Sequence, residues 1–341
     1  MMYDVTIGIP VYKSRPYVER AMKSALGQTF PSIEFLVIDD AGNDGSLEFV
    51  RQMTSQHPRG KDVHVISHST NQGVSASRNE IIKKAQGEFL YFMDSDDEIC
   101  ENTIELLMRH ATRYEAEIVF GSYERIDLSG EKTIYLYPSV QLFGEDQLAS
   151  FAYRKYGGIQ ASACNYLVKT SLIRQNRLRF IDTDYWEDLV FTFDLVTYIS
   201  RAVLLPDITY SYYCREDSLS HYQGREQISK DEILQNIHTI DHLKNTSSVL
   251  KNKIYFPNRC YNIVMTDFYI ACNVLKRRES IIPYISSKEI KDMMRHPATL
   301  GRICHFRQSR LRNMFLYFIG IMPSSMCVFT IWSLAKLKKL I

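Results

Sequence analysis

GEFLYFMDSDD, residues 87–97, is an apolar run that ends in a group of carboxylates. A short apolar run of this kind is typical of a buried β-strand. Carboxylate oxygens gathered at its end are ligands that Mg²⁺ and Mn²⁺ prefer, and these ions favour diphosphate oxygens in turn. We therefore expect a metal site at Asp94 and Asp96. The alternative is an acidic turn that caps a helix beginning near Asn102.

The chain on both sides of this run repeats one pattern, in which apolar, β-branched segments alternate with helix-like segments. The expected strands are 5–10, 33–39, 63–67, 89–93 and 118–122, and the expected helices are 16–26, 45–53, 76–85 and 103–114. This alternation predicts an α/β fold with a mostly parallel sheet flanked by helices. Ligands of such sheets bind beyond the carboxyl ends of the strands, where polar residues follow the first, second and fourth strands here.

The polar residues at these strand ends suit a nucleotide. Asp39 and Asp40 follow the second strand, and a carboxylate there can accept hydrogen bonds from a ribose or a base N–H. We favour Asp40, while an Asx turn is the alternative for one of the two. Tyr12 offers a ring on which a base can stack, although a Tyr in a loop is often simply part of the surface. Arg78, in NQGVSASRN, lies in a first helical turn suited to phosphate, and a plain capped helix is its alternative.

Charge is unevenly distributed along the 341 residues. From Lys276 to the end there are thirteen Lys or Arg and three acidic residues, so the preceding 275 residues carry a net charge of about −8. A basic end on an acidic body indicates a membrane surface or an anionic partner. The seven cysteines are scattered without a CxxC pair, which predicts neither a disulfide framework nor a zinc site. The first residues lack a signal-peptide pattern, so we expect a reducing, cytoplasmic location.

The last forty residues contain an unusual apolar stretch. Residues 313–335 carry no charge, and basic residues flank them on both sides: Arg302, Arg307, Arg310 and Arg312 before, and Lys336, Lys338 and Lys339 after. A straight helix of this length would span roughly 35 Å. Because Pro323 interrupts the stretch and both flanks are basic, we favour two short helices lying in the membrane interface. A buried helical hairpin and a spanning helix are the alternatives.

Five motifs resemble, in order, those of glycosyltransferase family 2: IGIPVYK, QTFPSIEFLVIDDAGNDGS, NQGVSASRN, GEFLYFMDSDD and WEDLVF. The resemblance covers about residues 3–221. It implies a GT-A fold, a nucleoside-diphosphate-sugar donor, a divalent metal held by a DxD motif, and inversion at the anomeric carbon. Lys13 stands where the family usually has Asn, and Ser77 where it often has Ala, and neither position belongs to the metal or base site.

The resemblance also implies roles for single residues. Asp94, Ser95 and Asp96 become the DxD motif, with Asp96 as the main metal ligand, and the nucleotide contacts become Pro10, Tyr12, Asp39, Asp40, Arg78 and Ser95. Asp188, in the pair Glu187-Asp188, becomes the general base, with Asp182 and Asp184 as rivals.

Further residues near that pair have weaker assignments. Tyr185, Trp186 and Glu187 are expected beside the sugars, although core packing explains the two aromatic residues equally well. His221 is a candidate third metal ligand, and Arg215 a candidate partner for diphosphate charge.

We accordingly expect a catalytic domain over residues 1–222, a helical region over 223–300 and a membrane-associating tail over 301–341. Residues 1–122 form the nucleotide-binding half and 123–222 the acceptor-side half of the catalytic domain. The expected activity is Mn²⁺- or Mg²⁺-dependent, inverting transfer from a UDP-sugar to a glycan or polyprenyl-diphosphate-linked acceptor at the inner face of the cell membrane. The alternatives are a sugar-phosphate nucleotidyltransferase and a non-catalytic sugar-binding or scaffold protein.

Overall fold

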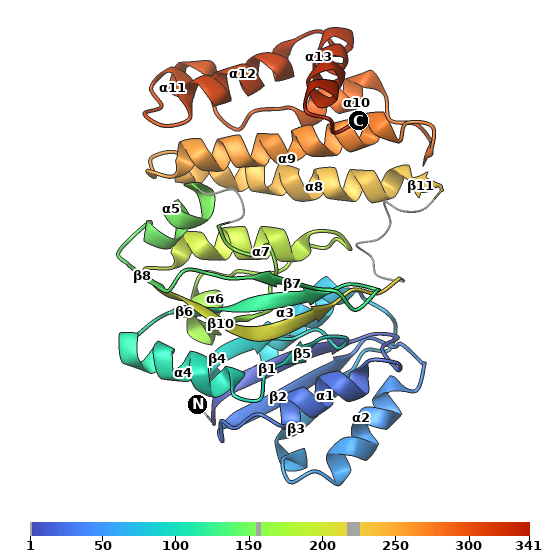
Figure 1. Ribbon diagram of the computed structural model, residues 1–341, viewed down its shortest axis with the longest axis vertical. Helices are drawn as coiled ribbons and strands as arrows, with labels where there is room; N and C mark the ends of the chain where they lie inside the picture. The colour runs from blue at the N-terminus through green and yellow to red at the C-terminus, as the bar shows by residue number, and fades with distance from the viewer. Residues whose placement is uncertain (1, 155–157, 217–225) are drawn as a thin grey trace. The chain divides into compact units, whose positions relative to one another are not determined.

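The computed structural model describes residues 2–154, 158–216 and 226–341. The chain forms two compact units (Figure 1). The first comprises Met1–Leu148 and Ile159–Ser218, and the second comprises Ala149–Gly158 and Leu219–Ile341. The boundary expected at residue 222 lies outside the described residues. Residues 149–158 group with the C-terminal segment, which nothing in the sequence indicated.

A mixed sheet forms the centre of the first unit. Its order is β3-β2-β1-β4-β9-β6-β10-β5, with β7 beside β6 and β8 beside β10. The strands are β1 (Tyr3–Val11), β2 (Ile33–Asp39), β3 (Val63–Ser67), β4 (Gly87–Phe92), β5 (Glu98–Ile99), β6 (Ile118–Ile126), β7 (Lys132–Tyr135), β8 (Val140–Phe143), β9 (Tyr166–Lys169) and β10 (Arg201–Tyr213). β3, β2, β1 and β4 are mutually parallel, which confirms the expected α/β sheet. β9 runs antiparallel between β4 and β6.

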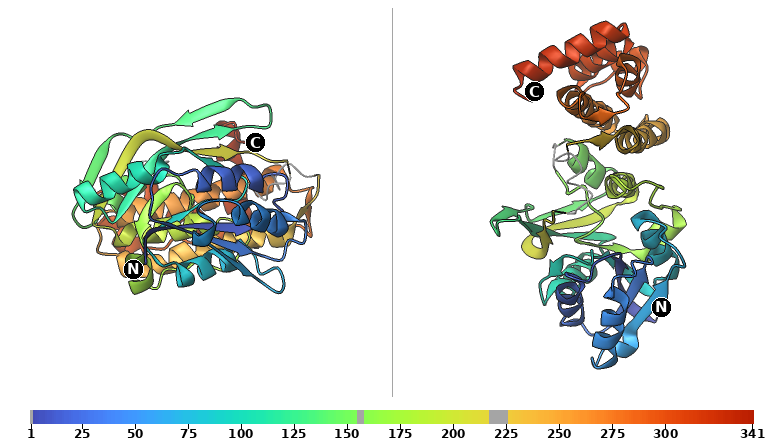
Figure 2. Two further views of the ribbon diagram at one scale, coloured as in Figure 1. Left: turned by 90° about the horizontal axis from the view of Figure 1, so that it is seen from below. Right: turned by 90° about the vertical axis from the view of Figure 1, so that its right-hand side faces the viewer.

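Helices flank the sheet of the first unit. They are α1 (Val18–Leu26), α2 (Ser46–Ser55), α3 (Val74–Lys84), α4 (Thr103–Tyr114), α6 (Thr170–Gln175) and α7 (Glu187–Leu195). Short 3₁₀ helices lie at η1 (Gly60–Asp62) and η2 (Val196–Tyr198). α1 and α2 pack together on one face, while α3 packs on β1 and β2 from the other (Figure 2). β2 is buried along its whole length, as a parallel strand covered on both faces must be.

One glycine sets the position of α3. A Cβ on Gly8 of β1 would lie 2.4 Å from Ile81 Cγ2, so the helix approaches the strand more closely than another residue there allows. Because Arg78 lies on the same helix, this close packing fixes its backbone relative to the end of the sheet.

The second unit is helical, as the periodicity between residues 225 and 295 predicts. Its elements are α5 (Gln147–Arg154, most of which belongs here), α8 (Lys230–Thr246), η4 (Ser247–Leu250), α9 (Phe256–Lys276), α10 (Ser287–Met293), α11 (Leu300–Cys304), α12 (Arg310–Ile321) and α13 (Ser324–Leu337), with short strands β11 (Ile228–Ser229) and β12 (Ile281–Ile282). Ser229 and Glu232 form a capping box that begins α8.

The expected interruption at Pro323 separates α12 from α13. α12 buries Asn313, Leu316 and Ile319, and α13 buries Cys327, Ile331 and Ala335, so each helix packs through one face. The other faces expose large apolar side chains: Leu311, Phe315, Phe318, Met326, Phe329 and Trp332. In the described part of the chain, no helix combines the length and the apolar character needed to cross a bilayer.

Candidate active site

Three aspartates gather in the loop that follows β4. Oxygens of Asp94, Asp96 and Asp97 all lie within 4.8 Å of one another. Asp97 is buried and accepts hydrogen bonds from Tyr210 Oη at 2.6 Å and from the Tyr213 backbone N–H at 2.8 Å. Asp97 therefore fixes the loop to β10, while Asp94 and Asp96 are more exposed. The sequence motif indicated Asp94 and Asp96 but not the anchoring role of Asp97.

Asp96 is held in an electrostatic balance with an arginine. Arg215 Nε lies 2.5 Å from Asp96 Oδ2, an ion pair by distance although not aligned as a hydrogen bond. Burial and the neighbouring Asp94 raise the pKa of Asp96 to about 6, and Arg215 opposes them. Arg20 supports the same loop by donating to the Asp96 carbonyl. The Arg215 guanidinium thus lies against the carboxylate at which the sequence predicts a metal ion.

These residues fit a divalent cation. Clustered carboxylates repel one another in a poorly solvated loop, and hard oxygen ligands of this kind suit Mg²⁺ or Mn²⁺. Burial and the Asp94 carboxylate are the main causes of the raised pKa of Asp96, and a bound cation would lower that pKa again. His221, the expected third ligand, lies outside the described residues.

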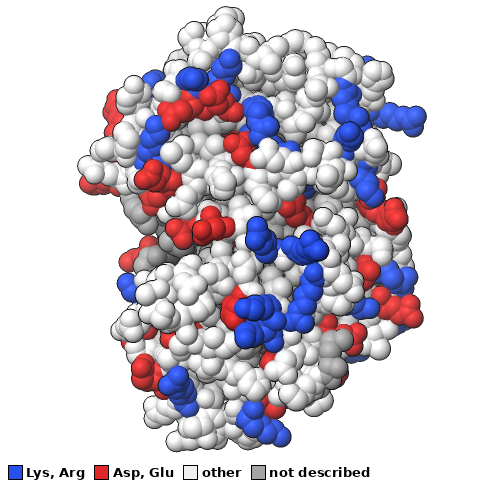
Figure 3. All heavy atoms as spheres, turned by 180° about the vertical axis from the view of Figure 1, so that it is seen from behind, with Lys and Arg blue, Asp and Glu red and all other residues white. Residues whose placement is uncertain are grey.

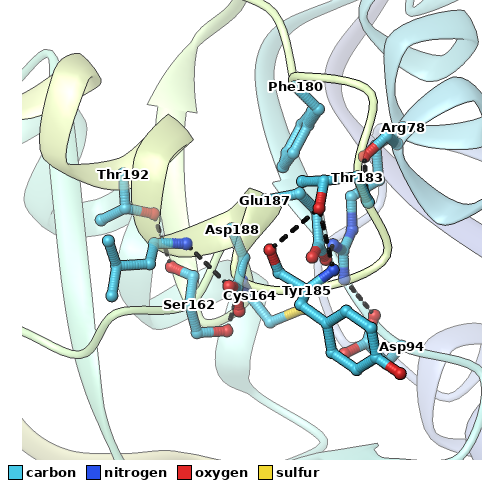
Figure 4. Close-up of polar contacts among 12 residues, drawn as sticks. Arg78, Asp94, Ser162, Cys164, Phe180, Thr183, Tyr185, Glu187, Asp188 and Thr192 are labelled. Atoms are coloured by element: carbon cyan, nitrogen blue, oxygen red, sulfur yellow. Dashed lines mark hydrogen bonds and ion pairs between the residues drawn. The ribbon is translucent and has the colours of Figure 1, made fainter. Parts of the chain in front are cut away.

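Arg78 joins the acidic loop to the start of α7 (Figure 4). Nη1 donates to Glu187 Oε1 at 2.5 Å, and Nη2 donates to Asp94 Oδ1 at 2.8 Å. The side chain is buried, which alone would lower its pKa, but Asp94 and Glu187 raise the Arg78 pKa well above its ordinary value. Arg78 is therefore a permanent cation with both ends of its guanidinium in use, and its contact with phosphate stays a prediction.

An aromatic cluster supports this corner of the unit. The rings of Phe180 and Phe191 stack with centroids 4.1 Å apart, and Phe92 at the end of β4 contacts both edge-on. Asn79 on α3 also exchanges hydrogen bonds with the backbone of Phe180. The cluster thus positions the beginning of α7 next to the acidic loop.

Asp188 lies one residue into α7, beside this network (Figure 4). Its Oδ1 accepts a 2.7 Å hydrogen bond from the Leu189 N–H. Burial and the adjacent Glu187 raise the pKa of Asp188 to about 8, and Arg78 offsets only part of this. A carboxyl group with such a pKa can take up a proton near neutral pH, as a general base requires. The rivals Asp182 and Asp184 are both exposed.

The aromatic residues before α7 differ in environment. Tyr185 is buried, which agrees with core packing, whereas Trp186 is partly exposed. Trp186 has a φ of 60°, an uncommon backbone conformation for a bulky residue. Their expected contacts with sugar stay predictions.

The two aspartates after β2 have different surroundings. Asp40 accepts hydrogen bonds from the backbone N–H groups of Gln72 and Gly73, each at 2.8 Å, and its Oδ1 lies 2.7 Å from His68 Nδ1. Asp40 therefore ties β2 to the loop that begins α3. Within the described residues the Asp39 carboxylate has no hydrogen-bond or ion-pair partner, although the side chain is largely buried.

The remaining expected nucleotide residues lie at the end of β1 and in the acidic loop. Pro10 is buried in β1, and Tyr12 follows it with 42% of its surface exposed. Ser95 Oγ lies 2.7 Å from Ser14 Oγ, so a hydroxyl pair connects the two loops. Ser14 is a contact that no sequence motif indicated.

The mixed α/β sheet, with carboxylates beyond its strand ends, has the architecture called the GT-A fold. A structure of S. aureus TarS 1–349 in complex with UDP-GlcNAc matches this chain with a TM-score of 0.64 and 18% identity, covering 93% of this chain and 90% of that chain. This likeness shows the fold.

Sequence comparisons give the family. Residues 6–168 match the family model Glycosyl transferase family 2, so these residues form a domain of that family. An uncharacterized glycosyltransferase of Haemophilus influenzae is 26% identical over 260 residues, which cover 76% of this chain and 95% of that protein. A poly(ribitol-phosphate) beta-glucosyltransferase of Bacillus spizizenii is 27% identical over 220 residues, which cover 62% of this chain and 32% of that protein.

Proposed function

We propose that this glycosyltransferase moves a sugar from a UDP-sugar to a hydroxyl group of a glycan or lipid-linked glycan, with inversion at the anomeric carbon. The observation that carries the proposal is the Arg78 bridge, which joins the aspartate cluster to the helix bearing Asp188. Inversion requires a base on one side of the sugar and charge stabilisation of the leaving diphosphate on the other. The two groups of carboxylates supply one function each.

In this proposal Asp96 and Asp94 hold Mg²⁺ or Mn²⁺, which would neutralise charge on the departing diphosphate. Asp188 accepts the proton of the acceptor hydroxyl as that oxygen attacks the anomeric carbon. With a cation on Asp96, Arg215 would be free to contact the diphosphate. Arg78 keeps Glu187 paired and holds the start of α7 in place throughout.

For the nucleotide we propose Asp39 in preference to Asp40 as the acceptor of base or ribose hydrogen bonds. The carboxylate of Asp40 already accepts from two backbone N–H groups, whereas the carboxylate of Asp39 has no partner within the described residues. Tyr12 is exposed enough to stack on a base, and Pro10 and Ser95 border the same strand ends.

A panel of nucleotide sugars, incubated with the purified chain, Mn²⁺ and glycan acceptors, tests the transfer. We expect nucleoside diphosphate to be released with one donor, and NMR of the product to show the inverted anomeric configuration. Retained configuration would contradict the single displacement. Pyrophosphate formed from a sugar 1-phosphate and a nucleoside triphosphate would indicate a nucleotidyltransferase instead, and turnover of neither substrate set would indicate a binding protein.

We also propose that the chain attaches to the cytoplasmic face of a membrane through α12 and α13. Phe329 and Trp332 on α13 are 66% and 40% exposed, and Phe315 and Phe318 on α12 are 52% and 42% exposed. Exposed basic residues flank these apolar faces: Arg310, Arg312, Lys336, Lys338 and Lys339. Exposed aromatic side chains with basic neighbours are typical of helices that lie in the interface of an anionic membrane.

Sedimentation with phosphatidylglycerol vesicles tests this attachment. The double variant Phe329→Ser/Trp332→Ser should remain in the supernatant. The control Leu234→Ser/Val249→Ser, which also removes two exposed apolar side chains from the second unit, should sediment like the unmodified protein. Equal sedimentation of all three proteins would refute the role of α13.

A further inference from the structure

A groove in the second unit is lined by cations. It is formed by the turn after η4, the start of α9 and the segment around α11, and it encloses about 790 Å³. Its charged lining residues are Lys251, Lys253, Arg302 and Arg307, and His305 adds an imidazole. All of its lining residues lie in the described part of the chain, and none is acidic.

Three of the cations in this groove, Lys251, Arg302 and Arg307, have no counter-charge within the described residues. Among the described residues, no carboxylate lies within ion-pair distance of Lys251, Arg302 or Arg307. Arg302 instead donates through Nη2 to Asn252 Oδ1 at 2.8 Å and to the Lys251 carbonyl. Its Nε is buried and has no acceptor within the described residues. Clustered cations without counter-charges attract an anion.

The groove also has an apolar floor. Phe256 and Phe306 are buried and meet edge-on with centroids 5.8 Å apart. The Arg302 guanidinium lies 5.7 Å from the centroid of the Phe256 ring, so packing restricts where this cation can lie. Lys251 and Arg307 at the rim are exposed. The groove therefore suits a ligand that alternates carbon-rich units with anionic groups.

The groove lies at one end of the helical unit. In Figure 1, α11 and the start of α9 share the left-hand end of that unit. Turning the molecule by 180° brings this end to the right, where Figure 3 shows Lys and Arg side chains on the upper part of the right-hand side. None of the groove residues belongs to the aspartate cluster or to the Arg78 network.

We propose that this groove binds a phosphodiester-linked stretch of the acceptor chain. Lys251 and Arg307 contact the phosphate oxygens, Arg302 supplies fixed positive charge, and Ile254, a lining residue that is 57% exposed, packs against the carbon-rich units. Guanidinium and ammonium groups are well suited to phosphate, and an open groove accommodates a chain better than a single small anion. That the bound ligand is the acceptor rests on the proposed function, whereas binding of a phosphodiester-linked ligand to the groove does not.

The test is binding of a short synthetic glycerol-phosphate oligomer to the full-length protein, measured by calorimetry without donor sugar. The variant Lys251→Gln/Arg307→Gln should lose affinity by about tenfold or more, and wild-type affinity should fall steeply between about 50 and 200 mM salt. The control Lys276→Gln/Arg278→Gln removes the same charge from the same unit outside the groove and should bind normally. Circular dichroism should show that both variants are folded, since all four side chains are exposed.

Two outcomes would overturn the proposal. The first is equal affinity of the groove variant and the control for the oligomer. The second is loss of phosphatidylglycerol-vesicle binding by the groove variant with its oligomer binding intact, because the ligand would then be a lipid headgroup. Transfer to a short glycan acceptor without phosphodiester groups separates this proposal from the proposed function. A groove variant that still releases nucleoside diphosphate in that assay leaves the transferase standing, and a wild-type chain that releases none with any donor and acceptor contradicts the proposed function.

Discussion

Arg78 and Glu187 are 109 positions apart in the chain and form a hydrogen bond of 2.5 Å between Nη1 and Oε1. The bond joins α3 to the first residue of α7, and the second arm of the same guanidinium reaches Asp94. Removing one member of a buried arginine with two carboxylate partners lowers the free energy of unfolding, because the remaining charges are left without a partner in a poorly solvated site.

We therefore expect Arg78→Met to lower the free energy of unfolding by about 3 kcal/mol, the lower end for a broken buried ion pair because Asp94 is partly exposed. The double variant Arg78→Met/Glu187→Met should lose less, because Glu187, the more buried of the two bonded carboxylates, is no longer left without its cation. Urea unfolding measures both, and Arg51→Met on the exposed face of α2 is the control. A single variant as stable as the control would contradict the structural role of the bridge.

The sequence predicts the parallel part of the sheet well because its signal is local. Apolar runs and helical periodicity recur within a few residues, so β1 to β4 and the helices between them are predicted within a few residues of their bounds. The antiparallel insertion of β9 between β4 and β6 leaves no such signal. Its neighbours are set by pairing between segments far apart in the chain.

In the candidate site, too, local motifs are predictable and contacts between distant segments are not. The acidic loop and the Glu187-Asp188 pair are recognisable from motifs, but the partners of these side chains are not. The sequence favours Asp40 for the nucleotide, and only the structure shows its carboxylate bonded to the backbone of Gln72 and Gly73. Similarly, no sequence pattern indicates that both terminal nitrogens of Arg78 donate hydrogen bonds to carboxylates.

The different surroundings of Asp39 and Asp40 predict different effects of replacing each of them. Asp39→Ala should weaken UDP binding with little loss of stability, because the protein makes no hydrogen bond to that carboxylate within the described residues. Asp40→Ala should lower the free energy of unfolding by about 1–3 kcal/mol, because two partly buried hydrogen bonds from backbone N–H groups are lost. Calorimetry with UDP and thermal unfolding separate the two effects. The reverse pattern would restore Asp40 as the nucleotide ligand.

Metal binding should depend on Asp96 and be opposed by Arg215. Asp96→Asn should weaken Mn²⁺ binding by about tenfold or more, as loss of a ligand does. Arg215→Gln should instead tighten it in the absence of nucleotide, because the guanidinium 2.5 Å from Asp96 Oδ2 competes for that oxygen. Calorimetric titration with Mn²⁺ measures both. Weaker binding by Arg215→Gln would contradict the competition.

Asp97→Asn serves as the matched control for the same cluster. Its carboxylate already accepts hydrogen bonds from Tyr210 and Tyr213, so we expect lower thermal stability and nearly normal Mn²⁺ binding.

The pH dependence of transfer should report the ionisation of Asp188. Its pKa of about 8 lies above the ordinary value, so the protonated carboxyl predominates below that pH and kcat/KM should rise with pH towards about 8. Asp188→Asn should lower kcat by about 10²–10⁴-fold while donor affinity is kept. Asp182→Asn and Asp184→Asn are the matched controls and should remain active. A profile that is flat between about pH 5 and 9 would contradict the assignment of the base.

A second buried ion pair makes the stability of the helical unit depend on pH. Lys244 Nζ lies 2.8 Å from Asp267 Oδ2, and both side chains are inaccessible to solvent. Burial raises the pKa of Asp267 to about 7 although Lys244 opposes it. Because this folded-state pKa lies above the ordinary value, the stability that protonated Asp267 contributes is complete at low pH and is lost as the pH rises through 7.

Lys244→Met should therefore destabilise the protein more at alkaline than at acidic pH. Above the pKa of Asp267 the variant leaves a buried carboxylate without its cation, at a cost of about 3–5 kcal/mol. At acidic pH the carboxyl takes up a proton and most of that cost disappears. The double variant Lys244→Met/Asp267→Leu removes both charges, so its urea midpoint should vary less with pH than that of either the single variant or the unmodified chain. A Lys244→Met midpoint that shifts equally at both pH values would show that Asp267 is not the group whose ionisation the lysine supports.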